Sequence, residues 1–277
     1  MSDAFLDRMA ESSARRLDAA RARLPMDELA RQAAALPPPP PLRLHQKGFD
    51  IIAELKLRSP SAGTLSDDGA GIEDRVIAYS SAGAAAVSVL TEPDRFGGNL
   101  AHLERAAAAL APLSVPVMRK DFLLHPYQVF EARVAGAGGI LAIARMLDDD
   151  ALRALVDTAL ELGMFVLLES FDVAEIARCA ALVSEYPAHH RADLLLGLNC
   201  RDLQTLEIDP ARLDVAASVF PDDAVAVAES GLFTAEDAAR LAGQGYRIAL
   251  VGTALMQTED PAALLRDMLG AGREAPS

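Results

Sequence analysis

Short apolar runs recur along the chain from residue 50 onward, separated by longer stretches in which apolar residues have helical spacing. Each run is too short for a helix and is rich in Val, Ile and Leu on both faces, which is typical of strands in a parallel sheet covered on both sides. The runs start far enough apart for a strand, a helix and two loops. The eight predicted strands are residues 50–56, 85–91, 115–120, 139–144, 164–170, 193–199, 224–230 and 247–252.

The stretches between these strands carry helix start signals. Pro126 stands at the first position of one predicted helix. Thr234 and Asp237 have the spacing of a capping box, and Asp260 followed by Pro261 begins the last helix. Eight strand–helix units predict an α/β fold of the closed (β/α)8 TIM-barrel type. An open doubly wound sheet would have fewer strands and a Gly-x-Gly-x-x-Gly turn after the first one.

Residues 1–48 have a different pattern. Five consecutive prolines at 37–41 cannot form a helix or a central strand, which predicts a stiff, extended connector. We therefore expect residues 1–48 to be an appended N-terminal helical extension with a proline linker, part of the same domain as a barrel at residues 49–277. Apolar residues spaced for one or two amphipathic helices are Phe5, Met9, Leu17, Leu24 and Leu29.

The composition narrows the class of protein. Hydrophobic residues make up 51% of the 277 residues, and 26 Lys and Arg against 40 Asp and Glu give a net charge of −14. An excess of acid argues against nucleic-acid binding, which needs basic charge to displace counterions. No apolar run approaches the roughly 18 residues of a membrane span, and the N-terminus lacks the apolar core of a signal peptide. We expect a cytoplasmic enzyme or binding domain with no nucleic-acid or membrane partner.

Polar residues interrupt the apolar runs near their carboxyl ends, where barrels place their active sites. Because residues two apart on a strand point to the same side, Glu54 and Lys56 can both face the barrel interior. Burying ionisable groups is costly unless they are paired, so two lysines, three glutamates and an asparagine at one rim favour a functional site over a structural ion pair. The candidates are Glu54, Lys56, Lys120, Glu169, Asn199, Arg201 and Glu229.

The last two strand ends are small. Residues 229–231 read Glu-Ser-Gly and residues 251–253 read Val-Gly-Thr, which exposes backbone N–H groups where a helix begins. Barrels commonly bind phosphate in the loops after their seventh and eighth strands. A tight strand-to-helix turn would have a similar sequence, but the position on these two strands favours a phosphate site.

Long, specific motifs cover nearly all of residues 50–256. They are 51–63 (IIAELKLRSPSAG), 88–100 (SVLTEPDRFGGNL), 116–137 (PVMRKDFLLHPYQVFEARVAGA), 196–209 (LGLNCRDLQTLEID), 228–232 (AESGL) and 250–256 (LVGTALM). In order and spacing the chain resembles the indole-3-glycerol-phosphate synthase family, barrel enzymes of tryptophan biosynthesis. The N-terminal helices resemble the extra segment that packs over the catalytic face in this family.

The resemblance implies a reaction and roles for five residues. The phosphorylated substrate would be 1-(2-carboxyphenylamino)-1-deoxy-D-ribulose 5-phosphate, and ring closure, decarboxylation and dehydration would give indole-3-glycerol phosphate, CO2 and water. No cofactor and no metal are implied. Lys120 matches the family's lysine acid, and Glu169 matches the carboxylate that assists dehydration. Lys56 matches a second lysine that shares proton transfer, Glu54 the glutamate that organises the lysines, and Asn199 a residue that orients the substrate.

The resemblance also implies a set of substrate-binding residues. Phosphate contacts carry over to Ser59, Gly231, Gly252 and Thr253. Aromatic walls for the anthranilate ring carry over to Phe96 and Phe122, although ordinary loop packing would also account for these two rings. The implied set is Ser59, Pro60, Phe96, Phe122, Arg201, Glu229, Ser230, Gly231, Leu250, Gly252 and Thr253.

Three segments depart from the commonest family pattern. Leu57 and Arg58 replace a pair such as Arg-Ala, residues 135–143 read AGAGGILAI in place of AGADAILLI, and residues 170–172 read Ser-Phe-Asp in place of Val-His-Asp. None removes a residue assigned to chemistry. Because neighbouring side chains support a site, these changes leave specificity and rate open.

Other interpretations are less consistent with the residues. The sister barrel phosphoribosylanthranilate isomerase uses a Cys base on strand 1 and an Asp acid on strand 6, where this chain has Glu54 and Asn199. A catalytically inactive ligand-binding barrel would be favoured by loss of Lys120 or Glu169, and both are present. The chain ends shortly after the eighth predicted strand, so we expect no fused second barrel. We expect a monomer, with a weak dimer as the alternative, and the order in which the two lysines donate protons stays open.

The remaining histidines and cysteines have simpler explanations. His189 and His190 stand in a predicted loop with no third ligand at useful spacing, so we expect no metal site. Cys179 and Cys200 are too few for a disulfide framework. Strand alternation should turn Cys200 away from the barrel interior, because Asn199 faces inward.

Overall fold

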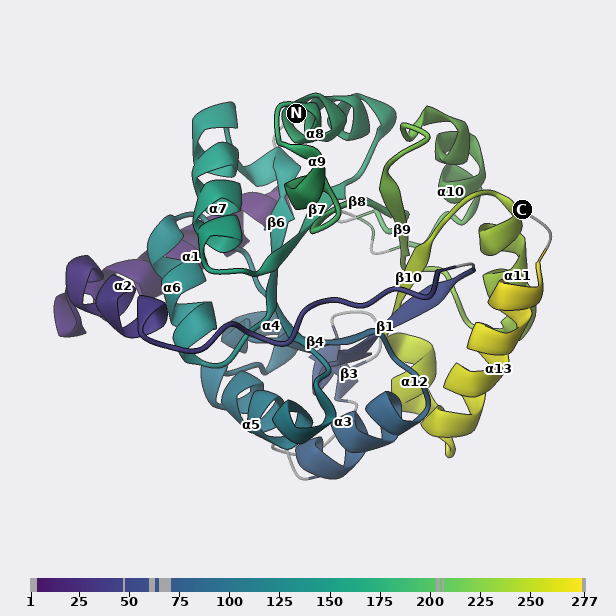
Figure 1. Cartoon of the computed structure of the whole chain (residues 1–277), viewed down its shortest axis with the longest axis horizontal. Coiled ribbons are helices and arrows are strands. Elements are labelled where there is room, and N and C mark those ends of the chain that lie inside the picture. The colour runs from purple at the N-terminus through teal and green to yellow at the C-terminus, as the bar shows by residue number, and fades with distance from the viewer. Residues whose placement is uncertain are drawn as a thin grey trace.

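Eight parallel strands close into a barrel in the computed structural model, which describes residues 4–46, 48–59, 63–64, 71–202, 205 and 207–275 (Figure 1). Each strand pairs with the next along the chain, and β1 pairs with both β4 and β10, which closes the ring. This confirms the predicted TIM barrel. The strands are β1 (Asp50–Leu55), β4 (Ala86–Leu90), β5 (Val117–Lys120), β6 (Gly139–Ile143), β7 (Phe165–Ser170), β8 (Leu194–Asn199), β9 (Val225–Glu229) and β10 (Ile248–Val251).

Helices surround the barrel, and several begin at the predicted signals. His125 caps the helix that Pro126 opens, and Thr234 and Asp237 form the predicted capping box. A short hairpin, β2 (Arg58–Ser59) with β3 (Gly63–Thr64), follows β1. The helices around the barrel are α3 (Ile72–Ser81), α4 (Pro93–Phe96), α5 (Leu100–Leu110), α6 (Pro126–Val134), α7 (Asp149–Glu161), α8 (Val173–Ser184), α9 (Ala188–Arg191), α10 (Ala211–Ala216), α11 (Ala235–Gly243), α12 (Thr253–Gln257) and α13 (Pro261–Glu274).

The apolar residues form two concentric layers. Alternate strand residues point outward and pack against the helices, and those between them fill the barrel interior. Both faces of the strands are therefore buried, which explains why the runs are continuously apolar. Residues of the inner layer include Ile52, Met118, Leu141, Phe165, Leu167, Leu195, Val227 and Ile248.

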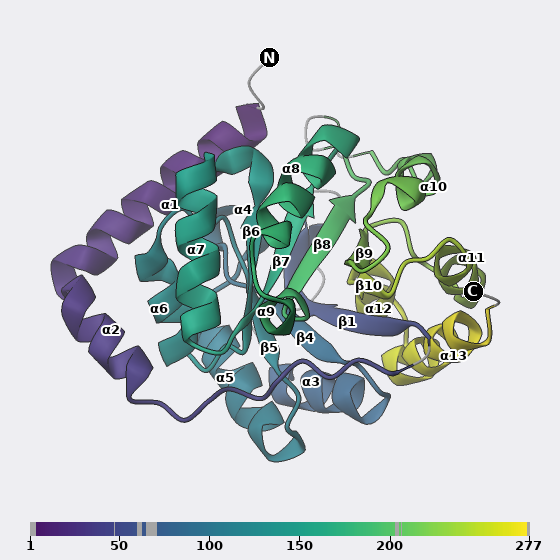
Figure 2. The same ribbon diagram turned by 45° about the horizontal axis from the view of Figure 1, so that its top comes forward.

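The N-terminal segment folds as two helices, α1 (Ala4–Arg23) and α2 (Met26–Ala34), at one side of the barrel (Figure 2). Leu6 and Met9 of α1 are buried in the same cluster as the inner barrel residues. Ser13 donates a hydrogen bond to the carbonyl of Phe122, in the loop after β5. Helix α1 therefore lies over the carboxyl ends of the strands.

The linker passes the opposite end of the barrel, as Figure 1 shows in dark purple. Leu42 and Leu44 pack against the inner apolar layer from the amino ends of the strands. The backbone N–H of His45 donates to Asp50 at 2.7 Å, at the start of β1. The linker thus covers one end of the barrel and leaves the other to α1. No helix among the described residues is long and apolar enough to cross a membrane.

Candidate active site

A pocket of about 1060 Å³, including the solvent at its mouth, lies at the carboxyl ends of the strands. Its lining includes all of the predicted site residues except Ser59 and Pro60. Pro60 lies outside the described residues, and so does the side chain of Ser59, whose backbone is in β2. The predicted residues that the fold brings together here are Glu54, Lys56, Phe96, Lys120, Phe122, Glu169, Asn199, Arg201, Glu229, Ser230, Gly231, Leu250, Gly252 and Thr253.

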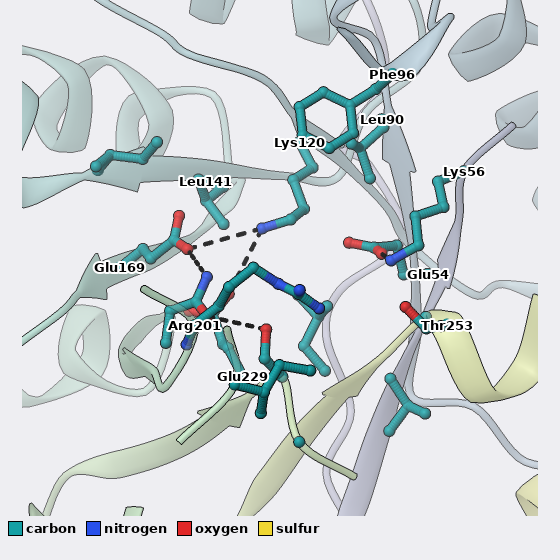
Figure 3. A pocket seen from close by; sticks show the side chains of 18 of the residues that line it. Glu54, Lys56, Leu90, Phe96, Lys120, Leu141, Glu169, Arg201, Glu229 and Thr253 are labelled. Carbon is teal, nitrogen blue, oxygen red and sulfur yellow. Dashed lines mark hydrogen bonds and ion pairs between the residues drawn. The ribbon is translucent and has the colours of Figure 1, made fainter. Parts of the chain in front are cut away.

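Lys120 lies among carboxylates from three strands (Figure 3). Its Nζ is 4.0 Å from Oε1 of Glu169 and 3.6 Å from Oε2 of Glu229. Burial opposes the charge on Lys120, but Glu169, Glu229 and Glu54 outweigh this and raise the pKa of the ammonium above its usual value. A charged ammonium can therefore face the pocket at neutral pH.

Glu229 is a buried carboxyl without a hydrogen bond to any described residue. Burial, and then repulsion from Glu169, raise the pKa of Glu229 to about 8, although Lys120 partly offsets the rise. Gly197 on the neighbouring strand β8 makes room for this carboxyl, because a Cβ there would be 2.4 Å from Oε1 of Glu229. The site thus contains a carboxyl that can hold a proton near neutral pH.

Glu54 and Lys56 form the second charged group of the pocket. Nζ of Lys56 is 2.7 Å from Oε1 of Glu54, and both side chains line the pocket as strand alternation predicts. Burial alone would raise the pKa of Glu54, but Lys56, Lys120 and Arg201 lower it overall, so this carboxylate is ionised. Gly252 is required beside this pair, because a Cβ there would be 2.1 Å from Oε1 of Glu54.

Asn199 connects neighbouring polar groups at the end of β8. Its Nδ2 donates to Oε1 of Glu169 at 2.5 Å, and its Oδ1 accepts from the Ser230 hydroxyl at 2.9 Å. The backbone N–H of Arg201 also donates to this Oδ1, at 3.0 Å. Asn199 therefore fixes the position of the Glu169 carboxylate. Burial lowers the pKa of the neighbouring Arg201 guanidinium, although its attraction to Glu54 partly offsets this.

Aromatic rings form an apolar wall across the pocket from β9 and β10. Phe122 contacts Phe5 of α1 edge to face, with ring centroids 6.0 Å apart, and Phe96 at 6.3 Å. Phe96 is held in place by Glu92, whose carboxylate accepts hydrogen bonds from three backbone N–H groups at the start of α4. Glu92, which also lines the pocket, thus caps α4.

Asp121, next to Lys120, anchors α1 over the pocket. Its carboxylate accepts two hydrogen bonds from Arg16, at 2.9 and 2.8 Å, and one from Thr91 at 2.7 Å. Burial alone would raise the pKa of Asp121, but Arg119 and then Arg16 lower it to about 2. The charge on Asp121 is therefore used to hold the N-terminal helix.

At the ends of β9 and β10 the pocket is lined by tight backbone turns. Ser230 and Gly231 both have positive φ angles, 68° and 78°, so the chain turns sharply after β9. Helix α12 begins at Thr253, directly after Gly252. A short extra helix after the eighth barrel strand is a common feature of phosphate sites in this fold.

Some pocket residues were not predicted from the sequence. The charged ones are Glu92 and Asp121, and the others are apolar residues such as Phe5, Leu90, Leu141, Ile143, Phe171 and Phe233. Leu90, Leu141 and Ile143 look like ordinary core positions, and strand alternation is the one signal that could have assigned them to the interior. Cys200 is buried in the outer layer between strands and helices, as alternation predicts.

A closed parallel barrel with ionisable side chains at the carboxyl ends of its strands has the architecture of the (β/α)8-barrel enzymes. Residues 6–268 match the family model described as indole-3-glycerol phosphate synthase. Curated relatives with that name include one from Nocardioides sp. (strain ATCC BAA-499 / JS614), 44% identical over 84% of this chain and 85% of the relative. Another, from Mycolicibacterium smegmatis, is 36% identical over 96% of this chain and 94% of the relative. The chain belongs to the indole-3-glycerol phosphate synthase family.

More distant solved structures share the fold. The 3-hexulose-6-phosphate synthase from Salmonella typhimurium has a TM-score of 0.61 at 16% identity, over 82% of this chain and 100% of that one. The thiamine phosphate pyrophosphorylase from Pyrococcus furiosus has a TM-score of 0.56 at 12% identity, over 83% and 98%. At these identities the likeness concerns the barrel alone.

Proposed function

We propose that the chain converts 1-(2-carboxyphenylamino)-1-deoxy-D-ribulose 5-phosphate to indole-3-glycerol phosphate, CO2 and water. Family membership supports the reaction, and the observation that carries the proposal is the charged Lys120 ammonium between Glu169 and Glu229. The reaction needs a proton donor at a developing oxyanion, and a desolvated ammonium both donates a proton and stabilises the negative charge.

The two halves of the pocket suggest how the substrate lies. The sugar phosphate would bind to the backbone after β9 and β10, near Gly231, Gly252 and Thr253, with the Lys56 ammonium in the same pocket. The aryl ring would then lie against Phe96 and Phe122. This orientation puts the ketone carbon between the two ends, at the level of Lys120.

Ring closure comes first in this mechanism. The aryl carbon that bears the carboxylate attacks the ketone carbon, and the carbonyl oxygen takes a proton from Lys120 as its negative charge develops. The carboxylate then leaves as CO2, and its bonding electrons restore the aromatic ring. The product of these two steps is a hydroxyl-bearing bicycle.

Dehydration completes the indole. The hydroxyl leaves as water after receiving a proton, and a base removes a proton from the neighbouring ring carbon to form the new double bond. We assign Glu169 to this step because Asn199 orients its carboxylate at 2.5 Å. The ionised Glu54 would hold the Lys56 ammonium in place, and Lys56 would supply the proton that the leaving hydroxyl takes.

The assay of the purified protein is direct. The carboxyphenylamino substrate is added without cofactor, and indole fluorescence is followed as product forms. We expect a continuous rise, and its absence would reject the proposed function. The Lys120→Ala variant, described below, tests the assignment of the acid.

The same proposal bears on the oligomeric state, the compartment and the domain organisation of the enzyme. The lining residues described above come from a single chain, so a monomer suffices, and dimerisation would be incidental. A charged, phosphorylated substrate stays in an aqueous compartment, which favours the cytoplasm. We take residues 1–48 as a part of the barrel domain, because α1 supplies Phe5 to the pocket.

A further inference from the structure

Phe171, the second residue after Glu169, lies between two cavities. Its side chain lines the active-site pocket and also a second cavity of about 1060 Å³, solvent at its mouth included, between α8 and α10. The residue is 5% exposed, and Arg201 is the other residue that lines both cavities. Phe171 is also the central residue of the segment 170–172, which reads Ser-Phe-Asp where the common family pattern has Val-His-Asp.

The neighbouring charged groups hold Phe171 in place. Its backbone N–H donates to Oε2 of Glu175 at 2.8 Å. The guanidinium carbon of Arg145 lies 5.0 Å from the ring centroid, at the distance of a cation–π contact. Arg145 in turn forms ion pairs with Asp172, at 2.9 Å, and with Glu175. Both the ring and the backbone of Phe171 are therefore fixed from the side away from the pocket.

Phe171 belongs to the apolar half of the pocket. It lies in the same buried cluster as Phe122, Leu141 and Ile143, whereas the turns at Gly231 and Gly252 follow β9 and β10. On the proposed function, this half holds the aryl ring of the substrate. We propose that Phe171 is a specificity-determining residue that limits the size of the aryl group by separating the apolar half of the pocket from the second cavity.

The second cavity provides space into which a larger aryl group could extend. Truncation of an ordinary core side chain leaves a closed void, but truncation of Phe171 would join the pocket to a space that already exists. An aryl ring with one extra methyl group would then fit without displacing backbone. A single methylene in an apolar pocket commonly changes specificity by roughly 10- to 200-fold, which sets the expected scale.

The test uses the full chain and a series of substrates with one methyl group at each unsubstituted ring carbon in turn. The measured quantity is kcat/KM for each methylated substrate divided by kcat/KM for the parent. In Phe171→Ala we expect this ratio to rise at least tenfold for one or more isomers, because the parent loses its wall while the larger ring gains room. Phe171→Leu, which keeps an apolar side chain, should shift the same ratios in the same direction by less.

Val173→Ala is the matched control, because Val173 lines the second cavity and not the pocket. Its ratios should stay within about twofold of the wild type, since specificity effects come from pocket contacts. Ratios unchanged for every isomer in both Phe171 variants would overturn the proposal, as would the same shift in Val173→Ala. If Phe171→Ala does not fold, Phe171→Leu decides. Failure of the wild type to convert the parent substrate would instead reject the proposed function.

Discussion

Lys120 and its carboxylate neighbours define the site at the scale of single residues. Burial favours a neutral lysine, but two glutamates within 4.0 Å keep Lys120 charged. Burial, and then repulsion from Glu169, raise the pKa of Glu229 to about 8, although Lys120 partly offsets the rise. The groups thus titrate as a coupled set. Close packing supports the arrangement, because Gly197 leaves space for the Glu229 carboxyl.

Lys120→Ala should remove the proton donor and leave the fold intact. General acids contribute roughly 10²- to 10⁴-fold, so we expect kcat to fall by at least a factor of about 100 with a much smaller change in KM. Indole fluorescence measures the rate, and circular dichroism measures the fold. Turnover near that of the wild type would contradict the assignment of Lys120 as the acid.

Glu229→Gln should change how stability depends on pH. The folded-state pKa of about 8 is above the usual 4.5, so folding favours the protonated carboxyl. This contribution is fully present below pH 4.5 and is lost as the pH rises through 8. The melting temperature of Glu229→Gln relative to the wild type should therefore increase from pH 5 to pH 9. The exposed Glu236→Gln serves as the control, and an equal trend in both variants would argue against a buried protonated Glu229.

Gly197→Ala should disturb the position of Glu229. The new Cβ would be 2.4 Å from Oε1 of Glu229 and 2.9 Å from Cδ1 of Leu167. Overpacking of this kind costs typically about 1–3 kcal/mol, and displacement of the carboxyl should also lower kcat. Gly270→Ala, where nothing lies within 4 Å of the added Cβ, should keep both stability and kcat. Thermal unfolding and the fluorescence assay measure stability and kcat in the two variants. Equal values in both variants would contradict this role of Gly197.

The element that completes the site is α1. The rest of the pocket comes mainly from strand ends and the loops after them, but Phe5 arrives from the N-terminal helix, across an extended linker. Its position depends on Arg16 and Asp121, and on Ser13 at the carbonyl of Phe122. Two elements far apart in the sequence are therefore joined at the residue next to Lys120.

Arg16→Ala should loosen α1 over the pocket. We expect KM to rise several-fold and the free energy of unfolding to fall by about 1 kcal/mol, since the Arg16 side chain is partly exposed and solvent screens the pair. The exposed Arg15→Ala on the same helix should change neither quantity. An unchanged KM in Arg16→Ala would mean that the ion pair does not position α1.

Asp121 should also contribute to stability in acid. Its folded-state pKa of about 2 is below the usual 3.8, so its contribution is present above pH 3.8 and is lost as the pH falls toward 2. Asp121→Asn should therefore unfold more easily than the wild type at pH 6, with the difference shrinking toward pH 2. Acid titrations followed by circular dichroism compare the two, and a constant difference would contradict this role.

At the scale of the whole molecule, the net charge of −14 contrasts with the charges in the pocket. Lys56, Lys120 and Arg201 all line it, and the surface acids lie largely on helices such as α7, where Asp148 caps the first turn. An anionic substrate therefore meets a local field set by a few buried groups. Global charge bears on solubility, and the fold decides which charges face the substrate.

Substrate binding should stabilise the whole barrel, because the pocket gathers residues from most of its strands. With Lys120→Ala, which should bind the substrate but convert it slowly, substrate at 100 times Kd should raise the free energy of unfolding by about 2.7 kcal/mol. The shift of melting temperature with substrate concentration measures this. The double variant Lys120→Ala/Arg16→Ala should need more substrate for the same shift, and no shift in either variant would mean that this pocket does not bind the substrate.

The barrel could be read from the sequence because strand and helix periods are local properties. Eight apolar runs covered on both faces permit few other folds, and polar residues at their ends, such as Glu54 and Asn199, could be assigned to one rim by alternation alone. Most of the charged site was therefore predictable from the order of residues. Apolar pocket residues such as Leu141 were not, because the pattern of an inward-facing core residue is the same at either end of a strand.

The sequence by itself thus determined the strands, their order and the polar groups at their ends. Tertiary structure alone decided which carboxylates face Lys120, that Asp121 holds α1, and that Phe171 lines two cavities. These features depend on distances between residues far apart in the chain. Local periodicity fixes the direction in which a side chain points, whereas pKa values and cavity shape depend on what it meets there.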